Sequence, residues 1–309
     1  MELDVQIPLW VTGATGFTGS LFLGHLEKSH PGMAVDCLVR STSDRAPLEG
    51  LALNLKYTIG DSARRPTWDA WLAERTPHTI VHIASIRHTP AMLDSLRAAG
   101  QTPRLIVVGT TGVYSQYNQY AQIYQQIEQQ LAQYAGSYCL LRPTMIYGSH
   151  RDKNLHKLLV FCDRTSFFPV FGTGNCLLQP IHADDLAQAI LATVQRPKIE
   201  GAYDLSGGSI VTFRELLSLV GSLLNKTIYP IPIPITAGVW LATALEGGLG
   251  QRSPVRREQI LRLQEDKAYP HAQAQRDLNF SPRSLEVGLK QEVELLCSQG
   301  ILANQAADL

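Results

Sequence analysis

This chain has no excess of positive or of negative charge. Its 309 residues hold 27 Lys and Arg side chains and 27 Asp and Glu side chains, so the formal net charge is zero. Proteins that bind along a nucleic-acid backbone carry a basic excess that neutralises phosphates, so we expect no nucleic-acid partner.

Cysteines are few: there are five, an odd number, widely spaced and without a CxxC pair. We therefore expect no disulfide framework and no metal site, and a reducing, cytoplasmic environment.

Long hydrophobic runs are also lacking. The most apolar stretch, 231–250, is interrupted by two prolines and by Glu246, whereas a membrane-crossing helix needs about 20 consecutive apolar residues. We therefore predict no transmembrane segment. The first ten residues, MELDVQIPLW, lack the basic region and the apolar run of a signal peptide. Within the apolar stretch we expect Leu241–Leu245, beside Trp240, to belong to a hydrophobic core.

What the first half of the sequence does have is a regular alternation of short apolar runs and helix-like segments. The runs are rich in Val, Ile and Leu, as in strands that are covered on both faces. The expected strands are Leu9–Thr12, Ala34–Val39, Lys56–Ile59, Thr79–Ala84, Arg104–Val108 and Tyr138–Leu141. The expected helices between them are Ser20–Ser29, Thr67–Arg75, Pro90–Ala99 and Gln119–Tyr134. This alternation predicts an α/β fold, a Rossmann-type doubly wound parallel sheet with right-handed crossovers.

A glycine-rich turn, TGATGFTG, lies between the first expected strand and the first expected helix. Gly13 suits a tight turn, Gly16 lets the backbone approach a pyrophosphate, and Gly19 lets the helix pack closely on the strand. The helix N-terminus offers free N–H groups and the positive end of its dipole to phosphates. The turn therefore predicts a dinucleotide site, to which Thr15 and Phe17 also belong.

The residues after the second expected strand bear on which dinucleotide is bound. Folds that bind NAD(H) usually carry an acid there, hydrogen-bonded to the ribose 2′-OH, whereas an arginine favours a 2′-phosphate. Here the strand is followed by Arg40 and Ser41. These two residues indicate NADP(H) as the preferred cofactor, with NAD(H) as the alternative.

The length of the chain exceeds that of one small domain. The alternation of strands and helices loosens after residue 142. We expect residues 1–146 to form the dinucleotide-binding domain. Residues 147–309 should form mainly a smaller, substrate-binding C-terminal lobe, with some segments returning to the first domain. A small-molecule substrate should bind at the carboxyl ends of the strands, between the two parts.

Five further motifs accompany the glycine-rich turn. They are GD at 60–61, VHIAS at 81–85, VGTTGVY at 108–114, RPTMIYG at 142–148 and PIHADDLA at 180–187. Together they make the chain resemble the short-chain dehydrogenase/reductase superfamily, in its extended or atypical NAD(P)-dependent epimerase/dehydratase branch. The resemblance covers most of the chain. It implies that Asp61 contacts adenine and that Ala84 and Pro143 lie beside the rest of the cofactor.

The same resemblance implies catalytic residues. Thr110 stands where the family places the hydroxyl that binds the substrate oxygen. The family also uses Tyr-x-x-x-Lys on the helix after the fifth strand, where the lysine favours the phenolate and binds the ribose. Tyr120 aligns best with that tyrosine because Glu128 follows at the family's usual offset, but Tyr124 then occupies the lysine position. Tyr124 is the rival proton donor, and the loop from Tyr114 to Tyr120 is shorter than in the family.

Two functions remain open at this point. The first is an NAD(P)-dependent oxidoreductase or epimerase acting on a carbonyl or carbinol of a small molecule, by resemblance a nucleotide sugar. Dehydratases of the branch follow the catalytic hydroxyl with an Asp-Glu pair, and Thr111 and Gly112 in its place argue against 4,6-dehydration. The second is an NADP(H)-binding structural or regulatory protein without turnover, because the lysine is absent. For either function we consider a homodimer.

Overall fold

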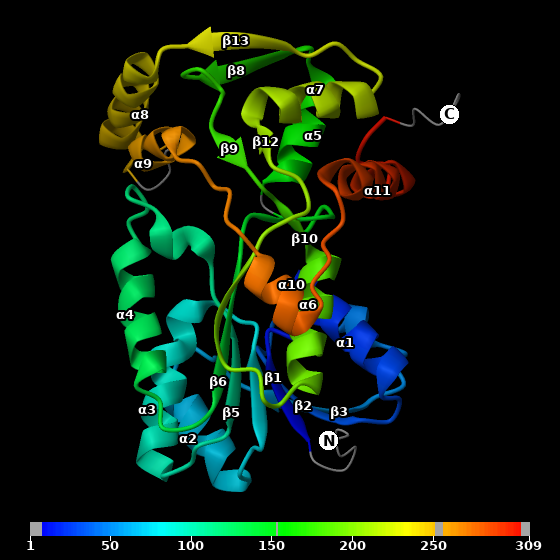
Figure 1. The fold of residues 1–309 in the computed structure, drawn as a ribbon, viewed down its shortest axis with the longest axis vertical. Coiled ribbons are helices and arrows are strands. Elements are labelled where there is room, and N and C mark those ends of the chain that lie inside the picture. Colours follow the sequence, from blue (N-terminus) through cyan, green and yellow to red (C-terminus); the bar gives the residue numbers. More distant parts are fainter. Residues whose placement is uncertain (1–7, 153, 251–255, 304–309) are drawn as a thin grey trace.

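The fold is built around a seven-stranded parallel sheet. A computed structural model describes residues 8–152, 154–250 and 256–303, and its sheet has the order β11-β6-β5-β4-β1-β2-β3 (Figure 1). The strands are β1 (Leu9–Thr12), β2 (Ala34–Val39), β3 (Asn54–Ile59), β4 (Thr79–His82), β5 (Arg104–Val108), β6 (Tyr138–Pro143) and β11 (Gly201–Leu205). The first six lie where the apolar runs predicted them. The doubly wound α/β fold is confirmed.

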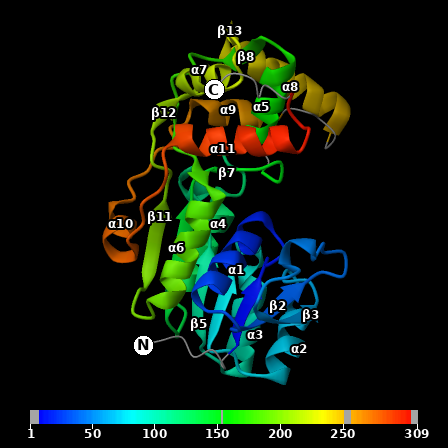
Figure 2. The same ribbon diagram turned by 90° about the vertical axis from the view of Figure 1, so that its right-hand side faces the viewer.

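Helices cover both faces of the sheet, which is why its central strands are apolar throughout. They are α1 (Phe17–Ser29), α2 (Arg65–Glu74), α3 (Thr89–Ala99), α4 (Ala121–Ala132) and α6 (Ala183–Gln195). Helices α1 and α6 lie side by side on one face (Figure 2), and α2, α3 and α4 cover the other. Successive residues of β1 alternate between the two: Val11 packs with the α1 and α6 side chains, and Trp10 stacks on Trp71 with ring centroids 3.9 Å apart.

The sheet order reverses between β1 and β4, and in doubly wound sheets such a reversal leaves a crevice at the carboxyl ends of the two strands. Their last residues are neighbours: Thr12 Oγ1 and His82 Nδ1 are 2.8 Å apart and buried. Burial lowers the pKa of His82 to about 4, so this histidine is neutral and belongs to the polar packing below the crevice. Ligands of doubly wound sheets bind at such a reversal.

A smaller lobe lies beyond the carboxyl ends of the strands (Figure 1). Its helices are α5 (Leu155–Arg164), α7 (Phe213–Leu223), α8 (Ile235–Leu249), α9 (Arg257–Leu261) and α11 (Leu285–Ser298). Short strand pairs join them: β7 (Ile146–Tyr147) with β10 (Ile181–His182), β9 (Leu177–Leu178) with β12 (Val211–Thr212), and β8 (Phe167–Phe171) with β13 (Tyr229–Ile233). Helix α10 (Ala272–Leu278) packs on β11 and α6 instead.

Helix α8 contains most of the apolar stretch and does not behave as core. Trp240 is 77% exposed and Leu241 is 59% exposed, whereas Ala242 is buried. The expectation that Leu241–Leu245 beside Trp240 lies in a core was therefore wrong for the exposed face of this helix. Among the described residues, none of the helices combines the length and the apolar character that crossing a membrane requires.

Where the chain passes between sheet and lobe, segments pack backbone against backbone. A Cβ on Gly207 would lie 1.8 Å from the carbonyl oxygen of Pro180, and one on Gly208 would lie 2.6 Å from that of Pro282. Real Cβ atoms do not approach other atoms so closely, so both positions need glycine.

Candidate functional site

The glycine-rich turn forms a cradle beside the crevice. Gly13 has a φ of +75°, which favours glycine, and a Cβ there would lie 2.8 Å from the backbone nitrogen of Ala84. The N–H of Gly16 donates to the carbonyl oxygen of Gly13 at 3.0 Å. A Cβ on Gly19 would lie 2.1 Å from that same oxygen. The turn therefore closes tightly: Gly19 is buried against it, and Gly16 remains exposed at its surface.

This surface fits the phosphates of a nicotinamide dinucleotide. The N-cap of α1 is Gly16. Because glycine has no side chain, it leaves the first N–H groups of the helix without a side-chain cap. Gly16 is exposed, and Thr15 and Phe17 on either side are half-buried. Helix N–H groups without a protein cap, next to glycines that leave room for close approach, are what an anionic pyrophosphate requires.

A second group of predicted residues lies at the ends of β2 and β3. Arg40 and Ser41 follow β2 and are exposed, and Asp61 follows β3. Parallel pairing brings these ends to the same edge of the sheet. Burial lowers the pKa of His88; Asp61 opposes the shift, and Arg40 adds to it. Arg40 and Asp61 therefore both lie within electrostatic reach of the His88 imidazole, at the ends of neighbouring strands.

Thr110 and Tyr124 meet at the carboxyl end of β5. Thr110 Oγ1 accepts a hydrogen bond from Gly112 N at 3.0 Å, which leaves its own proton free to donate. The position that a Cβ on Gly112 would take is 3.2 Å from Thr110 Oγ1 and 3.4 Å from Tyr124 Cε2. Pro143, at the end of the next strand, accepts from Thr111 Oγ1 at 3.3 Å. The predicted hydroxyl and one predicted tyrosine therefore share one small volume.

Tyr120 lies beside Tyr124, with ring centroids 6.3 Å apart. It is the N-cap of α4, so the helix begins later than the Gln119 predicted from the sequence. The guanidinium of Arg87, from the short helix η2 (Ile86–His88), lies 4.7 Å from the centroid of the Tyr120 ring. Burial raises the pKa of Tyr124, and Arg87 and Arg262 oppose that shift. Two arginines therefore stand near the tyrosine pair.

The helix that carries Tyr124 is braced against the sheet. Glu128 forms a two-bond ion pair with Arg142 of β6, with Nε to Oε1 at 2.9 Å and Nη2 to Oε2 at 2.6 Å. Arg142 also donates to the hydroxyl of Tyr114 at 3.0 Å, and that hydroxyl donates to Asp204 of β11 at 3.0 Å. This network, in which the charged groups are largely buried and Tyr114 is exposed, joins α4 to β6 and β11.

The short loop before Tyr120 is held by the lobe. Glu265 accepts hydrogen bonds from Ser115 Oγ at 2.7 Å, from Gln116 N at 2.6 Å and from Tyr117 N at 3.2 Å. Sequence reasoning missed Glu265, as it missed Arg87 and Arg262. The VHIAS motif ends two residues before Arg87, and the two lobe residues belong to no motif that the sequence analysis identified.

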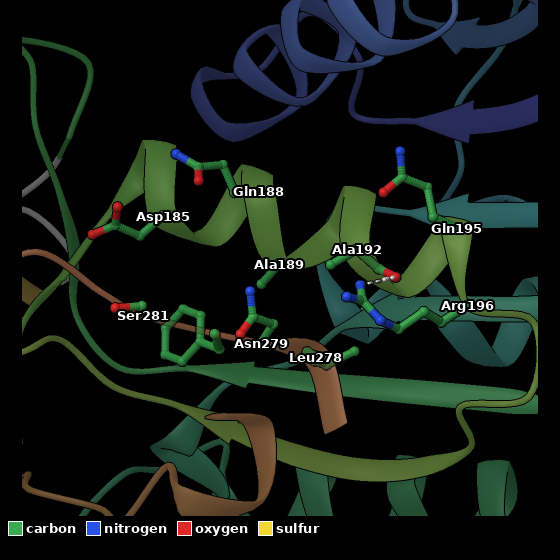
Figure 3. Close-up of a pocket in the computed structure, with 10 residues that line it drawn as sticks. Asp185, Gln188, Ala189, Ala192, Gln195, Arg196, Leu278, Asn279 and Ser281 are labelled. Carbon is green, nitrogen blue, oxygen red and sulfur yellow. Dashed lines mark hydrogen bonds between the residues drawn. The ribbon is translucent and has the colours of Figure 1, made fainter. Parts of the chain in front are cut away.

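A separate pocket lies along α6 and the segment after α10 (Figure 3). Its lining residues are Asp185, Gln188, Ala189, Ala192, Gln195, Arg196, Leu278, Asn279, Phe280 and Ser281. None of the predicted cofactor or catalytic residues belongs to this lining. Arg196 is partly engaged in it, because its Nη1 donates to the carbonyl oxygen of Ala192 at 3.2 Å. We therefore place the candidate site at the crevice and not at this pocket.

Two curated proteins are similar to part of this chain. An uncharacterized protein of Sinorhizobium fredii, y4nG, is 31% identical over 146 residues, which cover 47% of this chain and 36% of that protein. Subunit 9 of the mitochondrial NADH dehydrogenase (ubiquinone) 1 alpha subcomplex of Arabidopsis thaliana is 26% identical over 100 residues, covering 31% of this chain and 25% of that protein. The matches thus span about a third or less of these two relatives.

A solved structure shares the fold over nearly the whole chain. It is UDP-glucose 4-epimerase of Thermotoga maritima with UDP-glucose, and it has a TM-score of 0.69 at 18% identity over 95% of this chain and 99% of that chain. The profile of the NAD dependent epimerase/dehydratase family matches residues 9–205. This match confirms the resemblance seen in the motifs: the chain belongs to the NAD dependent epimerase/dehydratase family.

Proposed function

We propose that the protein is an NAD(P)-dependent oxidoreductase or epimerase that acts on a carbonyl or carbinol of a nucleotide sugar or a similar small molecule. The observation that carries this proposal is the proximity of Thr110 and Tyr124 around Gly112 at the carboxyl end of β5, with the Tyr120 ring beside that of Tyr124. The shared fold of an epimerase that binds UDP-glucose supports the substrate class. The substrate would lie between the dinucleotide-binding domain, residues 1–146, and the lobe formed mainly by residues 147–309, of which some segments return to the first domain.

The cofactor site would use the residues that surround the crevice. They are Gly13, Thr15, Gly16, Phe17, Gly19, Arg40, Ser41, Asp61, Ala84 and Pro143. The glycines and the first N–H groups of α1 hold the pyrophosphate, and Arg40 with Ser41 holds the 2′-phosphate of NADP(H). When bound, the nicotinamide supplies or accepts a hydride.

Proton transfer falls to the residues beyond β5. Thr110 donates a hydrogen bond to the substrate oxygen, and Tyr120 exchanges a proton with it, with Tyr124 as the alternative donor. The family's lysine has no counterpart at position 124, where this chain has a tyrosine. Arg87, whose guanidinium carbon lies 4.7 Å from the centroid of the Tyr120 ring, places a permanent positive charge beside that tyrosine.

Binding of NADPH and NADH, followed by nicotinamide fluorescence, tests the cofactor assignment. We expect NADPH to bind more tightly, and Arg40→Ala to weaken NADPH binding by about ten- to a hundredfold while leaving NADH unchanged, because one charged hydrogen-bonding group is worth roughly 1.5–3 kcal/mol. Arg97→Ala, at an exposed position of α3, is the control. Equal affinities of the wild type for both cofactors would refute the 2′-phosphate assignment.

The second candidate is a cofactor-binding protein without turnover. Tyr124 at the family's lysine position favours it, and one relative is named as a subunit of NADH dehydrogenase. The two candidates differ in one result. An oxidoreductase oxidises bound NADPH with at least one member of a panel of sugar-nucleotide and simple carbonyl compounds. An epimerase regenerates its cofactor and instead converts a nucleotide sugar into its epimer without net oxidation. Tyr120→Phe should slow either reaction. Tight binding with neither oxidation nor epimer formation across the panel favours the second candidate.

Two further assignments complete the proposal. The five cysteines are free, which suits a reducing, cytoplasmic location, and cell fractionation tests this location.

The exposed face of α8 presents Ala237, Trp240, Leu241 and Ala244 at helical spacing, and we assign the homodimer contact to this face. Sedimentation velocity of the wild type and of Trp240→Glu checks the assignment: a wild-type monomer overturns it.

A further inference from the structure

The loop after β7 places an arginine on the glycine-rich turn. Arg151 Nη2 donates to the carbonyl oxygen of Thr15 at 2.6 Å, and its Nη1 lies 3.5 Å from Ser20 Oγ. Thr15 immediately precedes the N-cap of α1, and Ser20 lies in its first turn. A permanent positive charge from a segment 130 residues away in sequence is thus fixed beside the helix N–H groups that suit a pyrophosphate.

The backbone around Arg151 is held in place. Its own N–H donates to Ser149 Oγ at 3.1 Å. The buried Asp152 accepts from Asn154 N at 2.7 Å and from His156 Nδ1 at 3.2 Å. The arginine therefore starts from a preset position, which lowers the entropy lost when a ligand engages its side chain.

The guanidinium has capacity to spare. It carries five N–H donors. Only two of them are engaged, one with Thr15 O and one, at the long distance of 3.5 Å, with Ser20 Oγ. Its exposed side chain leaves the remaining donors accessible. A guanidinium fork matches the oxygen pairs of a phosphate, so the group best suited to these donors is the diphosphate that the turn would hold.

We propose that Arg151 binds the pyrophosphate of the cofactor from the lobe side, opposite the N–H groups of α1. The inference rests on the proposed function, because it assumes that the turn holds a dinucleotide. It adds a residue that no motif of the cofactor site contains. It also means that cofactor binding ties the segment leading into the lobe to the sheet domain.

Equilibrium binding of the full chain tests this role without turnover. Wild type, Arg151→Gln, Arg151→Lys and the control Arg97→Gln are titrated with NADPH and NADH, then with ADP and with adenosine in competition. We expect Arg151→Gln to weaken NADPH, NADH and ADP by about tenfold or more, since a charged hydrogen bond is worth at least roughly 1.5 kcal/mol. Adenosine, which has no phosphate, should bind all four proteins equally. Arg151→Lys should recover part of the loss, because it restores the charge and not the fork.

Each other outcome has one meaning. If Arg151→Gln binds NADPH and ADP as the wild type does, the inference is overturned and the proposed function stands. If Arg151→Gln loses adenosine as strongly as ADP, the residue supports the fold of the site and the inference is also overturned. If the wild type binds neither NADPH nor NADH, the proposed cofactor site fails, and the inference fails with it.

Discussion

Glu292 makes a quantitative prediction about stability and pH. Its side chain on α11 is fully buried beside the carboxyl of Asp152, which is itself buried, and the backbone of Gly148. Burial, and then the neighbouring Asp152, raise the pKa of Glu292 from 4.5 to about 10. The folded protein therefore keeps this proton up to about pH 10, whereas the unfolded chain releases it near pH 4.5.

The sign of the effect follows from proton linkage. Between these two pH values the folded state binds more protons than the unfolded state, so the free energy of unfolding falls as pH rises, by about 1.4 kcal/mol per pH unit. From pH 4.5 to pH 7 the loss is on the order of 3 kcal/mol. Glutamine cannot ionise, so Glu292→Gln should match the wild type near pH 4.5 and exceed its stability by about that amount at pH 7.

Urea unfolding followed by tryptophan fluorescence measures this difference at pH 5, 7 and 9. The exposed Glu294 on the same helix provides the matched control, and Glu294→Gln should leave the pH dependence unchanged. The prediction requires the curves of wild type and Glu292→Gln to diverge as pH rises. Parallel curves would show that Glu292 does not carry its proton into the neutral range, and the reasoning from burial would be refuted.

Two further predictions concern the glycine-rich turn and the ion pair between Glu128 of α4 and Arg142. Gly19→Ala places a Cβ 2.1 Å from Gly13 O and should lower both the melting temperature and NADPH affinity, whereas Gly24→Ala in the same helix meets nothing within 4 Å and should stabilise by up to about 1 kcal/mol. Similar melting temperatures for the two variants would contradict the packing role of Gly19. Glu128→Gln weakens the pair with Arg142 in a mostly buried site and should cost about 1–3 kcal/mol in urea unfolding. A loss below about 0.5 kcal/mol would mean that the network does not fix α4.

The sheet was largely predictable because its signals are local. A strand covered on both faces must be apolar along its whole length, and every residue of β1 and β5 is buried. Strand β11 was not predicted, because its sequence GAYDL contains a charged residue and does not look like a buried strand. In the structure that residue, Asp204, is paired with Arg142 of the neighbouring strand β6. Strand β13 was missed as well, since YPIPI contains two prolines that cannot donate to a ladder.

The candidate site divides in the same way. The glycine-rich turn is a continuous segment, and the spacing of its three glycines is enough to indicate a dinucleotide site, so it could be identified from the sequence. Arg87 and Glu265 reach the Tyr120 region from segments far away in the chain, and only the fold brings them there. The exposed face of α8 was misjudged because an apolar composition does not say whether a helix faces the interior.

The crossing between sheet and lobe has a consequence for how this protein can diversify. At Gly207 and Gly208 the absence of a side chain lets backbone segments touch where the chain leaves β11 for the lobe. A larger residue at either position has to push Pro180 or Pro282 away. If the substrate lies between the sheet and the lobe, as proposed, substitutions at this crossing would change the space for it without altering a residue that touches it.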